Sequence, residues 1–191
     1  KHAGTNPNAQ KREPITIDDH QSSRLINDPL RLLDCCLVTD GGGAIIVTSA
    51  ERARDLRQRP ALIAGLGQVH SSEIIRPYDD GKGGGSEAAQ SAYRMAGCTA
   101  GDIDVVQLYD AFTITPMLAL EDLGFCPRGE SGRFVADGHL SISGSLPCNT
   151  DGGGLASNHP GKRGLLALIE GVRQLRGEGP GVQVKDAEVA L

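Results

Sequence analysis

Apolar runs of strand length alternate with segments of helical periodicity along this 191-residue chain. The runs at 44–48, 61–69 and 105–108 are rich in β-branched and aliphatic residues, which is typical of buried strands. A final strand is expected within 181–191. Strands that alternate with helices pack as a sheet that is covered by helices on both faces. The pattern therefore predicts an α/β fold.

Capping residues and glycines indicate where the helices begin and end. Ser49 and Ser86 are suitable N-caps for two of the helical patterns, and a glycine follows three of the four patterns. The predicted helices run from 50 to the residue before Pro60, and over 86–96, 115–123 and 164–175. A further short helix is expected to begin at Thr16. The segment 125–151 has no long periodicity and is predicted to form loops and short strands.

Charge, hydropathy and cysteine usage exclude several classes of protein. The net charge of −5 provides no basic surface, so no nucleic-acid partner is expected. No apolar run approaches the roughly 20 residues that span a bilayer, and 1–13 has no signal-peptide core. The five cysteines form no C-x-x-C pair, and adjacent Cys35 and Cys36 would face opposite sides of a strand, so no metal site is expected. These features predict a cytoplasmic protein with free thiols and no membrane span.

The stretch GGGLASNHPGKRG at 152–164 could bind a phosphate or present a histidine. A phosphate loop, G-x-x-x-x-G-K-[ST], anchored on Gly161 and Lys162 requires a glycine at 156 and a hydroxyl residue at 163. The chain has Ala156 and Arg163 at these positions. Two fixed positions fail, so nucleotide binding is disfavoured and His159 becomes the candidate functional residue.

Two loop tips carry groups that could do chemistry. Tyr109 and Asp110 follow a predicted strand, and His159 precedes the last predicted helix. Loops after strands are where α/β folds place their sites. Each residue also has an ordinary structural interpretation: a strand-end tyrosine packs, an aspartate caps a helix, and a histidine before proline caps or packs. The residue types alone leave both interpretations open.

Several blocks in a fixed order resemble one family. DVVQLYDAFTITPMLALEDLGFCPRGESGRF, LPCNTDGGGLASNHPGKRG and LLALIEGVRQLRG are similar to the C-terminal half of the thiolase superfamily. The similarity is greatest to sterol-carrier-type thiolases and to bacterial lipid-transfer proteins described as acetyl-CoA acetyltransferases. The resemblance implies a layered α/β/α fold with a mixed sheet. It also implies that 1–60 ends the N-terminal half and that 61–191 forms a C-terminal domain truncated before its final strands.

The resemblance further implies an acyltransferase that cleaves or forms a carbon–carbon bond beside a CoA thioester, in lipid or sterol side-chain metabolism. His159 matches the histidine of the family's G-H-P loop, which activates the nucleophile and donates to the thioester oxygen. Tyr109 would be a second donor and Asp110 an orienting group. No covalently bound cofactor or metal is implied, and coenzyme A would be a substrate or product. The residues implied to contact substrate or CoA are Phe112, Ser157, Asn158 and Lys162.

Departures from the family pattern keep other reactions open. Tyr109 stands where thiolases have Asn or His, and a Y-D-x-F tip resembles retro-aldolases that release a ketone from a β-hydroxyacyl-CoA. Those aldolases tend to lack the histidine that this chain keeps. The loop after His159 is one residue shorter than H-P-x-G-x-[ST]-G, and Lys162 and Arg163 replace its hydroxyl residue, so a cation could meet an acidic group of CoA.

No segment resembles the loop that carries the thiolase nucleophile, and Cys148 is not at its position. We therefore expect this chain to be inactive without the other half of the fold. A non-catalytic subunit that binds lipid or CoA is a further alternative. Since half of a thiolase fold would expose a sheet edge, association is also expected, either as a homodimer or as a hetero-oligomer with the missing half or a small partner subunit.

Overall fold

The computed structural model describes residues 1–70 and 84–191. Helices dominate the fold, with one small hairpin near the N-terminus. In chain order, the elements are α1 (His2–Thr5), α2 (Ile17–Ser22), β1 (Leu25–Asn27), β2 (Leu30–Arg31), the 3-10 helix η1 (Leu32–Asp34), α3 (Ala50–Ala53), α4 (Gly84–Ala96), the 3-10 helix η3 (Ala100–Asp102), α5 (Ile114–Asp122), α6 (Ser131–Ala136), α7 (Gly153–Ala156) and α8 (Arg163–Arg176).

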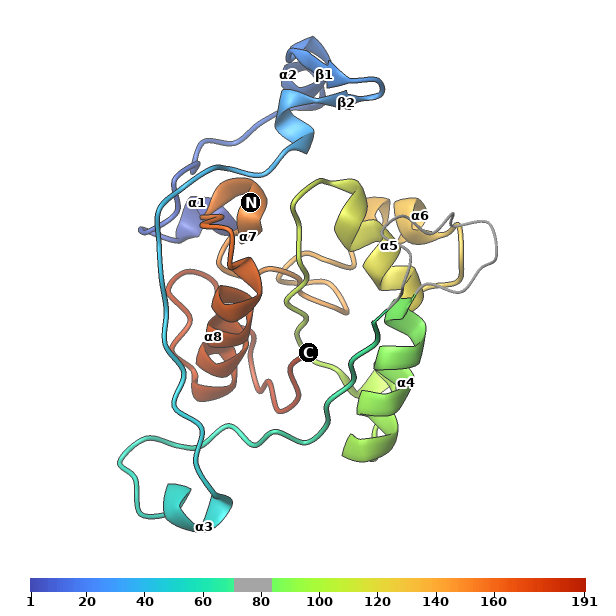
Figure 1. Cartoon of the computed structure of the whole chain (residues 1–191). Helices are drawn as coiled ribbons and strands as arrows, with labels where there is room; N and C mark the ends of the chain where they lie inside the picture. The colour runs from blue at the N-terminus through green and yellow to red at the C-terminus, as the bar shows by residue number, and fades with distance from the viewer. Residues whose placement is uncertain (71–83) are drawn as a thin grey trace.

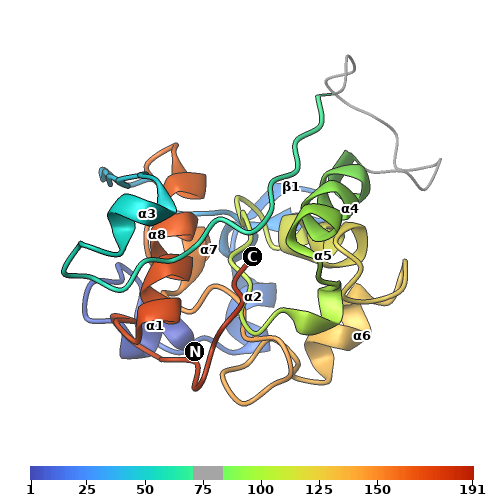
Figure 2. The same cartoon turned by 90° about the horizontal axis from the view of Figure 1, so that it is seen from below.

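The helices form two groups on either side of an extended segment. α7 and α8 lie on one side, α4, α5 and α6 lie on the other, and 103–113 runs between them (Figure 1). The C-terminus lies in the same central region (Figure 2). Val105 pairs with Ala190 and Val106 pairs with Cys148 through isolated parallel bridges. This arrangement places residue 109, at the end of the central segment, where the two groups of helices meet.

The apolar core surrounds this central segment. Val105, Val106 and Leu120 are completely buried. The core cluster joins the central segment, α5 and the chain before α7, and its buried members are Ile103, Val106, Leu108, Leu120, Cys126, Leu146 and Cys148. Burial of Ile103, Val105, Val106 and Leu108 makes the first part of the central segment a rigid base for the residues from 109 onward.

Of the predicted strands, only 105–108 and 181–191 take part in β-pairing in the described part of the chain, and they do so through isolated bridges of Val105, Val106 and Ala190. β1 and β2 form an antiparallel pair, with Leu25 opposite Arg31. Among the described residues, the predicted strands 44–48 and 61–69 take part in no β-ladder. Ile46 is 90% exposed and Leu62 is 72% exposed. Both segments leave large apolar side chains in solvent, although the backbone at Gly65 and Gly67 packs against α4. The apolar composition therefore wrongly indicated buried strands.

Most helix predictions are confirmed. Gly97, Gly124 and Gly177 follow α4, α5 and α8 in the left-handed region that favours glycine. Thr16 forms a capping box with Asp19 at the start of α2. Two predictions are wrong. α3 ends at Ala53 instead of continuing to Pro60, and the six-residue α6 lies within the segment predicted as loops and short strands.

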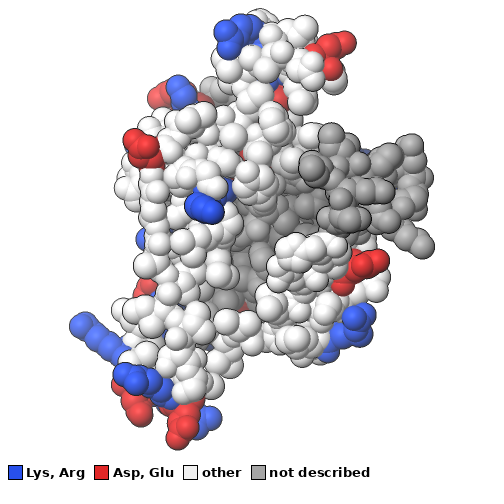
Figure 3. Space-filling model, viewed as in Figure 1, with Lys and Arg blue, Asp and Glu red and all other residues white. Residues whose placement is uncertain are grey.

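Residues 16–34 project from the body as a small unit of α2, β1, β2 and η1 (Figure 1). The extended chain that leaves this unit passes α7 and α8 before it reaches α3. Charged side chains gather over the projecting unit and over α3, and few lie in the middle of the face seen in Figure 3. In 1–70 and 84–191, no helix has the length and apolar character that crossing a membrane requires.

Candidate active site

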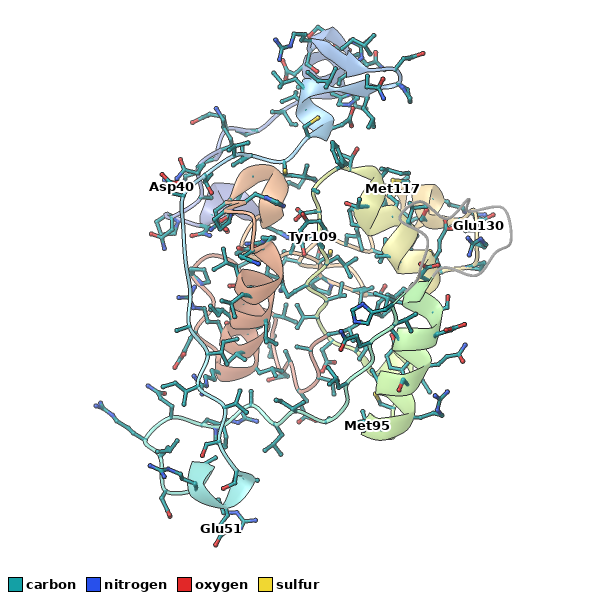
Figure 4. All side chains as sticks on the ribbon, viewed as in Figure 1. Asp40, Glu51, Met95, Tyr109, Met117 and Glu130 are labelled. Carbon is teal, nitrogen blue, oxygen red and sulfur yellow. The ribbon has the colours of Figure 1, made fainter. Side chains whose placement is uncertain are left out.

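The two loop tips meet. The Tyr109 hydroxyl and Nε2 of His159 are 3.1 Å apart, and the ring centroids are separated by 5.3 Å. Tyr109 is 51% exposed and His159 is half-buried, so the pair can be reached from solvent. Tyr109 lies in the centre of the molecule, between α7 and α5 (Figure 4). The expectation that these two tips converge is confirmed, whereas their catalytic roles stay predictions.

Asp110 connects the two tips below the Tyr109–His159 pair. Its carboxylate accepts hydrogen bonds from Gly154 N–H at 2.7 Å and from Leu155 N–H at 3.3 Å. Burial raises the pKa of Asp110, although these hydrogen bonds and the nearby Arg163 charge act in the opposite direction. With 2% of its surface exposed, Asp110 orients the loop rather than facing a substrate.

Two glycines allow this close approach of the tips. A Cβ at Gly153 would lie 2.1 Å from Oδ2 of Asp110, and Gly153 also has a positive φ of 69°. A Cβ at Gly154 would lie 2.8 Å from Cδ2 of His159. Both distances are too short for a real side chain, so the glycines at 153 and 154 are required by the contact between Asp110 and the histidine loop.

A buried ion pair closes the base of the loop that carries His159. Arg163 donates to both oxygens of Asp151, at 2.8 and 2.6 Å, and to the side-chain oxygen of Asn158 at 3.1 Å. Arg163 is 1% exposed. The expectation that the cation at this position could reach CoA is therefore wrong for Arg163. No local sequence signal reveals the pair, because Asp151 lies twelve residues away and in a different turn.

The residues implied to contact substrate or CoA differ in accessibility. Phe112 is 40% exposed and Lys162 is exposed, so both can reach a ligand. Asn158 is half-buried and its oxygen is bonded to Arg163. Ser157 is 1% exposed, and its carbonyl oxygen accepts from Gln10 N–H. This burial argues against direct contact between Ser157 and a ligand.

The thiols around the site are poor nucleophiles. Burial raises the pKa of Cys148 to about 12 and also raises the pKa values of Cys36 and Cys126. A thiolate is the reactive form of cysteine, so the raised pKa values argue against these three side chains as nucleophiles. The sequence-based decision not to assign Cys148 as the nucleophile agrees with its environment.

Comparison with known proteins assigns the chain to a family. The family model described as "Thiolase C-terminal domain-like" matches residues 67–191, which is well over half of the chain. The 17-hydroxy-3-oxo-4-pregnene-20-carboxyl-CoA lyase of Mycobacterium tuberculosis is 46% identical over 93% of this chain and 47% of its own length. The acetyl-CoA acetyltransferase of Methanothermobacter thermautotrophicus is 38% identical over the whole chain and 51% of its own length.

A solved structure described as "Ltp2-ChsH2(DUF35) aldolase" superposes on this chain with a TM-score of 0.90 and 43% identity. The match covers 99% of this chain and 50% of the other. The chain thus spans about half the length of the relatives it matches. The expected α/β thiolase-like fold is confirmed, and the chain belongs to the thiolase superfamily through its C-terminal domain.

Proposed function

We propose that the protein containing this chain cleaves a carbon–carbon bond of a β-hydroxyacyl-CoA by a retro-aldol reaction, with a steroid side chain as the substrate class. The contact between the Tyr109 hydroxyl and Nε2 of His159 carries this proposal. A retro-aldol reaction needs a proton acceptor and hydrogen-bond donors but no nucleophilic thiol. The names of the lyase relative and of the aldolase structure support the same reaction and substrate class.

The pair can move one proton through a closed cycle. The Tyr109 hydroxyl takes the proton of the substrate β-hydroxyl as it passes its own proton to Nε2 of His159. The oxygen electrons then form the ketone, the Cα–Cβ bond breaks, and its electron pair becomes the thioester enolate. His159 returns the proton through Tyr109 to the α-carbon, which yields a ketone and a shortened acyl-CoA. Hydrogen-bond donors near the thioester oxygen would stabilise the enolate.

Thiolysis by an acyltransferase is the second candidate, and His159 favours it. The thiolase superfamily uses a histidine in the G-H-P loop to activate its nucleophile, and the acetyltransferase relative is 38% identical to this chain. In that reaction the nucleophilic cysteine would be outside this chain, because no segment here resembles the loop that carries it. Coenzyme A is a substrate or product in either reaction, with Phe112 and Lys162 as the accessible contacts among those expected.

The two reactions can be separated by substrate. We expect the full-length protein to release a ketone from a β-hydroxyacyl-CoA steroid without added CoA. Tyr109→Phe and His159→Ala should each lower kcat by about 10²-fold or more, as is usual for loss of an acid–base group. Tyr93→Phe is the matched control, because the Tyr93 hydroxyl donates to the Leu123 carbonyl at the C-terminal end of α5.

Consumption of a β-ketoacyl-CoA together with free CoA, but not of the β-hydroxy substrate, would instead establish thiolysis. If neither substrate is consumed while CoA still binds, the chain belongs to the non-catalytic binding subunit considered from the sequence. Both outcomes overturn the retro-aldol proposal.

We also propose that this protein works as an assembly. Extended segments leave large apolar side chains in solvent, with Val38 99% and Ile46 90% exposed. Exposed apolar surface, where it is extensive, is typical of interfaces. The name of the aldolase structure pairs two components, which supports a hetero-oligomer. Light scattering of the full-length protein should give a mass well above that of one full-length polypeptide, and a monomer with the same exposed segments would contradict the proposal.

A further inference from the structure

The extended segment from Asp34 to Thr39 contacts both tips of the site. Its first part binds the tyrosine tip, since Thr113 N–H donates to the Asp34 carbonyl at 3.0 Å and Cys36 N–H donates to the Ala111 carbonyl at 2.8 Å. Its second part binds the histidine tip. Leu37 N–H donates to the Gly154 carbonyl at 3.0 Å. One short segment therefore spans the two loops whose meeting defines the site.

Thr39 makes the contact nearest to the imidazole. The backbone N–H of His159 donates to Oγ1 of Thr39 at 3.0 Å. The chain then continues beside the histidine loop. A Cβ at Gly41 would lie only 3.4 Å from Cγ of Pro160. Thr39 is half-buried, and its hydroxyl oxygen accepts the hydrogen bond from the single backbone N–H of His159.

The backbone of His159 is restrained from both sides. A following proline restricts ψ of the residue before it to extended values, so Pro160 limits this angle at His159. The hydrogen bond to Thr39 fixes the direction of the His159 N–H and hence restrains φ of His159. With both rotations restrained, the side chain of His159 leaves the backbone in one direction, toward Tyr109.

We propose that Thr39 is a positioning residue, which holds the His159 backbone so that Nε2 stays within hydrogen-bond distance of the Tyr109 hydroxyl. It acts through His159 and does not touch the reacting atoms. This inference rests on the proposed function for its effect on catalysis, but its structural part concerns only the geometry of His159.

The test compares two substitutions at Thr39 in the full-length protein. Thr39→Val keeps the shape and removes the hydroxyl, so kcat should fall about tenfold, the size expected for one lost hydrogen bond that aligns a reacting group, while KM changes less than about twofold. Thr39→Ser keeps a hydroxyl and should restore most of kcat. Thr99→Val is the matched control, since it removes a hydroxyl bonded to Asp102 in an exposed turn.

A double substitution tests the path through His159. Thr39→Val should lower kcat much less in a His159→Ala background than in the wild type, because the positioned group is already absent. Equal fold losses in both backgrounds would show that Thr39 acts independently of His159 and would overturn the inference.

A spectroscopic readout separates this inference from the proposed function. In wild-type protein, nitrogen NMR of the His159 ring should show a hydrogen-bonded Nε2, and Tyr109→Phe should shift that signal. We expect Thr39→Val to produce a shift in the same direction, without any substrate. If this shift occurs in a protein that is inactive on both substrates, the proposed function is wrong and the inference about Thr39 still holds. An unchanged ring signal in Thr39→Val would overturn the inference.

Discussion

Arg163 and Asp151 form a bidentate ion pair, with side chains that are 0% and 10% exposed, at the base of the loop that carries His159. The pair joins the start of α8 to the chain before α7, and Asp151 also accepts from Gly153 N–H at 2.9 Å. The loop is thus fixed at both ends while its tip remains accessible. The ion pair therefore adds to the contacts of Asp110 and Thr39 that hold the tip in place.

Loss of Arg163 should therefore unfold the loop and destabilise the whole chain. Arg163→Ala leaves the Asp151 carboxylate buried and unpaired, which costs about 3–5 kcal/mol. Chemical denaturation would measure this loss. Arg133→Ala is the matched control, because Arg133 pairs with Asp137 at an 80% exposed surface site and should change stability by less than about 0.5 kcal/mol. Similar losses in both variants would contradict the assigned role of the buried pair.

The contact between Asp110 and the histidine loop predicts a steric effect at Gly154. A Cβ there would lie 2.8 Å from the His159 ring and 2.9 Å from Oδ1 of Asp110. Gly154→Ala should lower stability by about 1–3 kcal/mol, the usual range for overpacking, and should displace the imidazole from Tyr109. Calorimetry and enzyme assay of the same samples would measure both effects.

Gly164 offers a control for this substitution. It lies in the first turn of α8, and a Cβ there would meet nothing within 4 Å. Gly164→Ala should leave activity unchanged and stabilise the chain by up to about 1 kcal/mol, because alanine favours the helix. A loss of activity at Gly164 equal to that at Gly154 would count against the steric explanation.

The parts of the fold that the sequence predicted are the parts set by local interactions. The capping box at Thr16 and the glycines after α4, α5 and α8 act within one helical turn, so their signals are readable from neighbouring residues. The meeting of Tyr109 and His159 was expected from the family resemblance. Neither position alone distinguished a site residue from a packing residue.

The parts that could not be predicted depend on distant residues. The apolar composition of 44–48 suggested a buried strand, but no described partner lies beside it, and burial is decided by partners rather than by composition. Likewise, Gly41 and Gly43 lie close to the histidine loop and to α8, so the need for glycine there depends on distant residues. A Cβ at Gly43 would lie 2.4 Å from Cδ1 of Ile169, a contact that no local pattern indicates.

A buried carboxyl on α8 predicts a dependence of stability on pH. Oε1 of Glu170 accepts from Thr150 at 2.6 Å and from Gln174 at 2.8 Å, while Oε2 is buried with no hydrogen-bond partner in the described chain. Burial raises the pKa of Glu170, although the two hydrogen bonds oppose this. Because the pKa of Glu170 is higher in the folded than in the unfolded state, its contribution to stability is fully present below the unfolded pKa. This contribution is lost as the pH rises through the folded pKa.

Glu170→Gln should remove this loss. Between the two pKa values, wild-type stability should fall by up to about 1.4 kcal/mol per pH unit relative to the variant, measured by denaturant unfolding in buffers from acidic to mildly basic pH. Glu178→Gln, at an exposed position just after α8, should leave the wild-type slope in place. Parallel curves for wild type and Glu170→Gln would refute the buried-carboxyl explanation.

Asp34 fixes the projecting unit to the tyrosine tip and predicts the opposite pH dependence. Its carboxylate accepts from Thr113 Oγ1 at 2.8 Å, from Arg31 N–H at 2.7 Å and from Nε2 of His20 at 2.9 Å. Burial acts to raise the pKa of Asp34, but the hydrogen bonds outweigh it and hold the pKa below its ordinary value. The resulting stability is present above the unfolded pKa and is lost as pH falls through the folded pKa.

Asp34→Asn should therefore loosen residues 16–34 at neutral pH, and wild-type protein should show the same loosening only in acid. Limited proteolysis is the direct measurement, since cleavage within an exposed segment rises as its local stability falls. We expect the variant to be cut several-fold faster than wild type at neutral pH and at a similar rate at low pH. Asp55→Asn, at an exposed position after α3, should be cut at the wild-type rate throughout. Equal cleavage of Asp34→Asn and wild type at neutral pH would show that the projecting unit is held by its remaining contacts and not by this carboxylate.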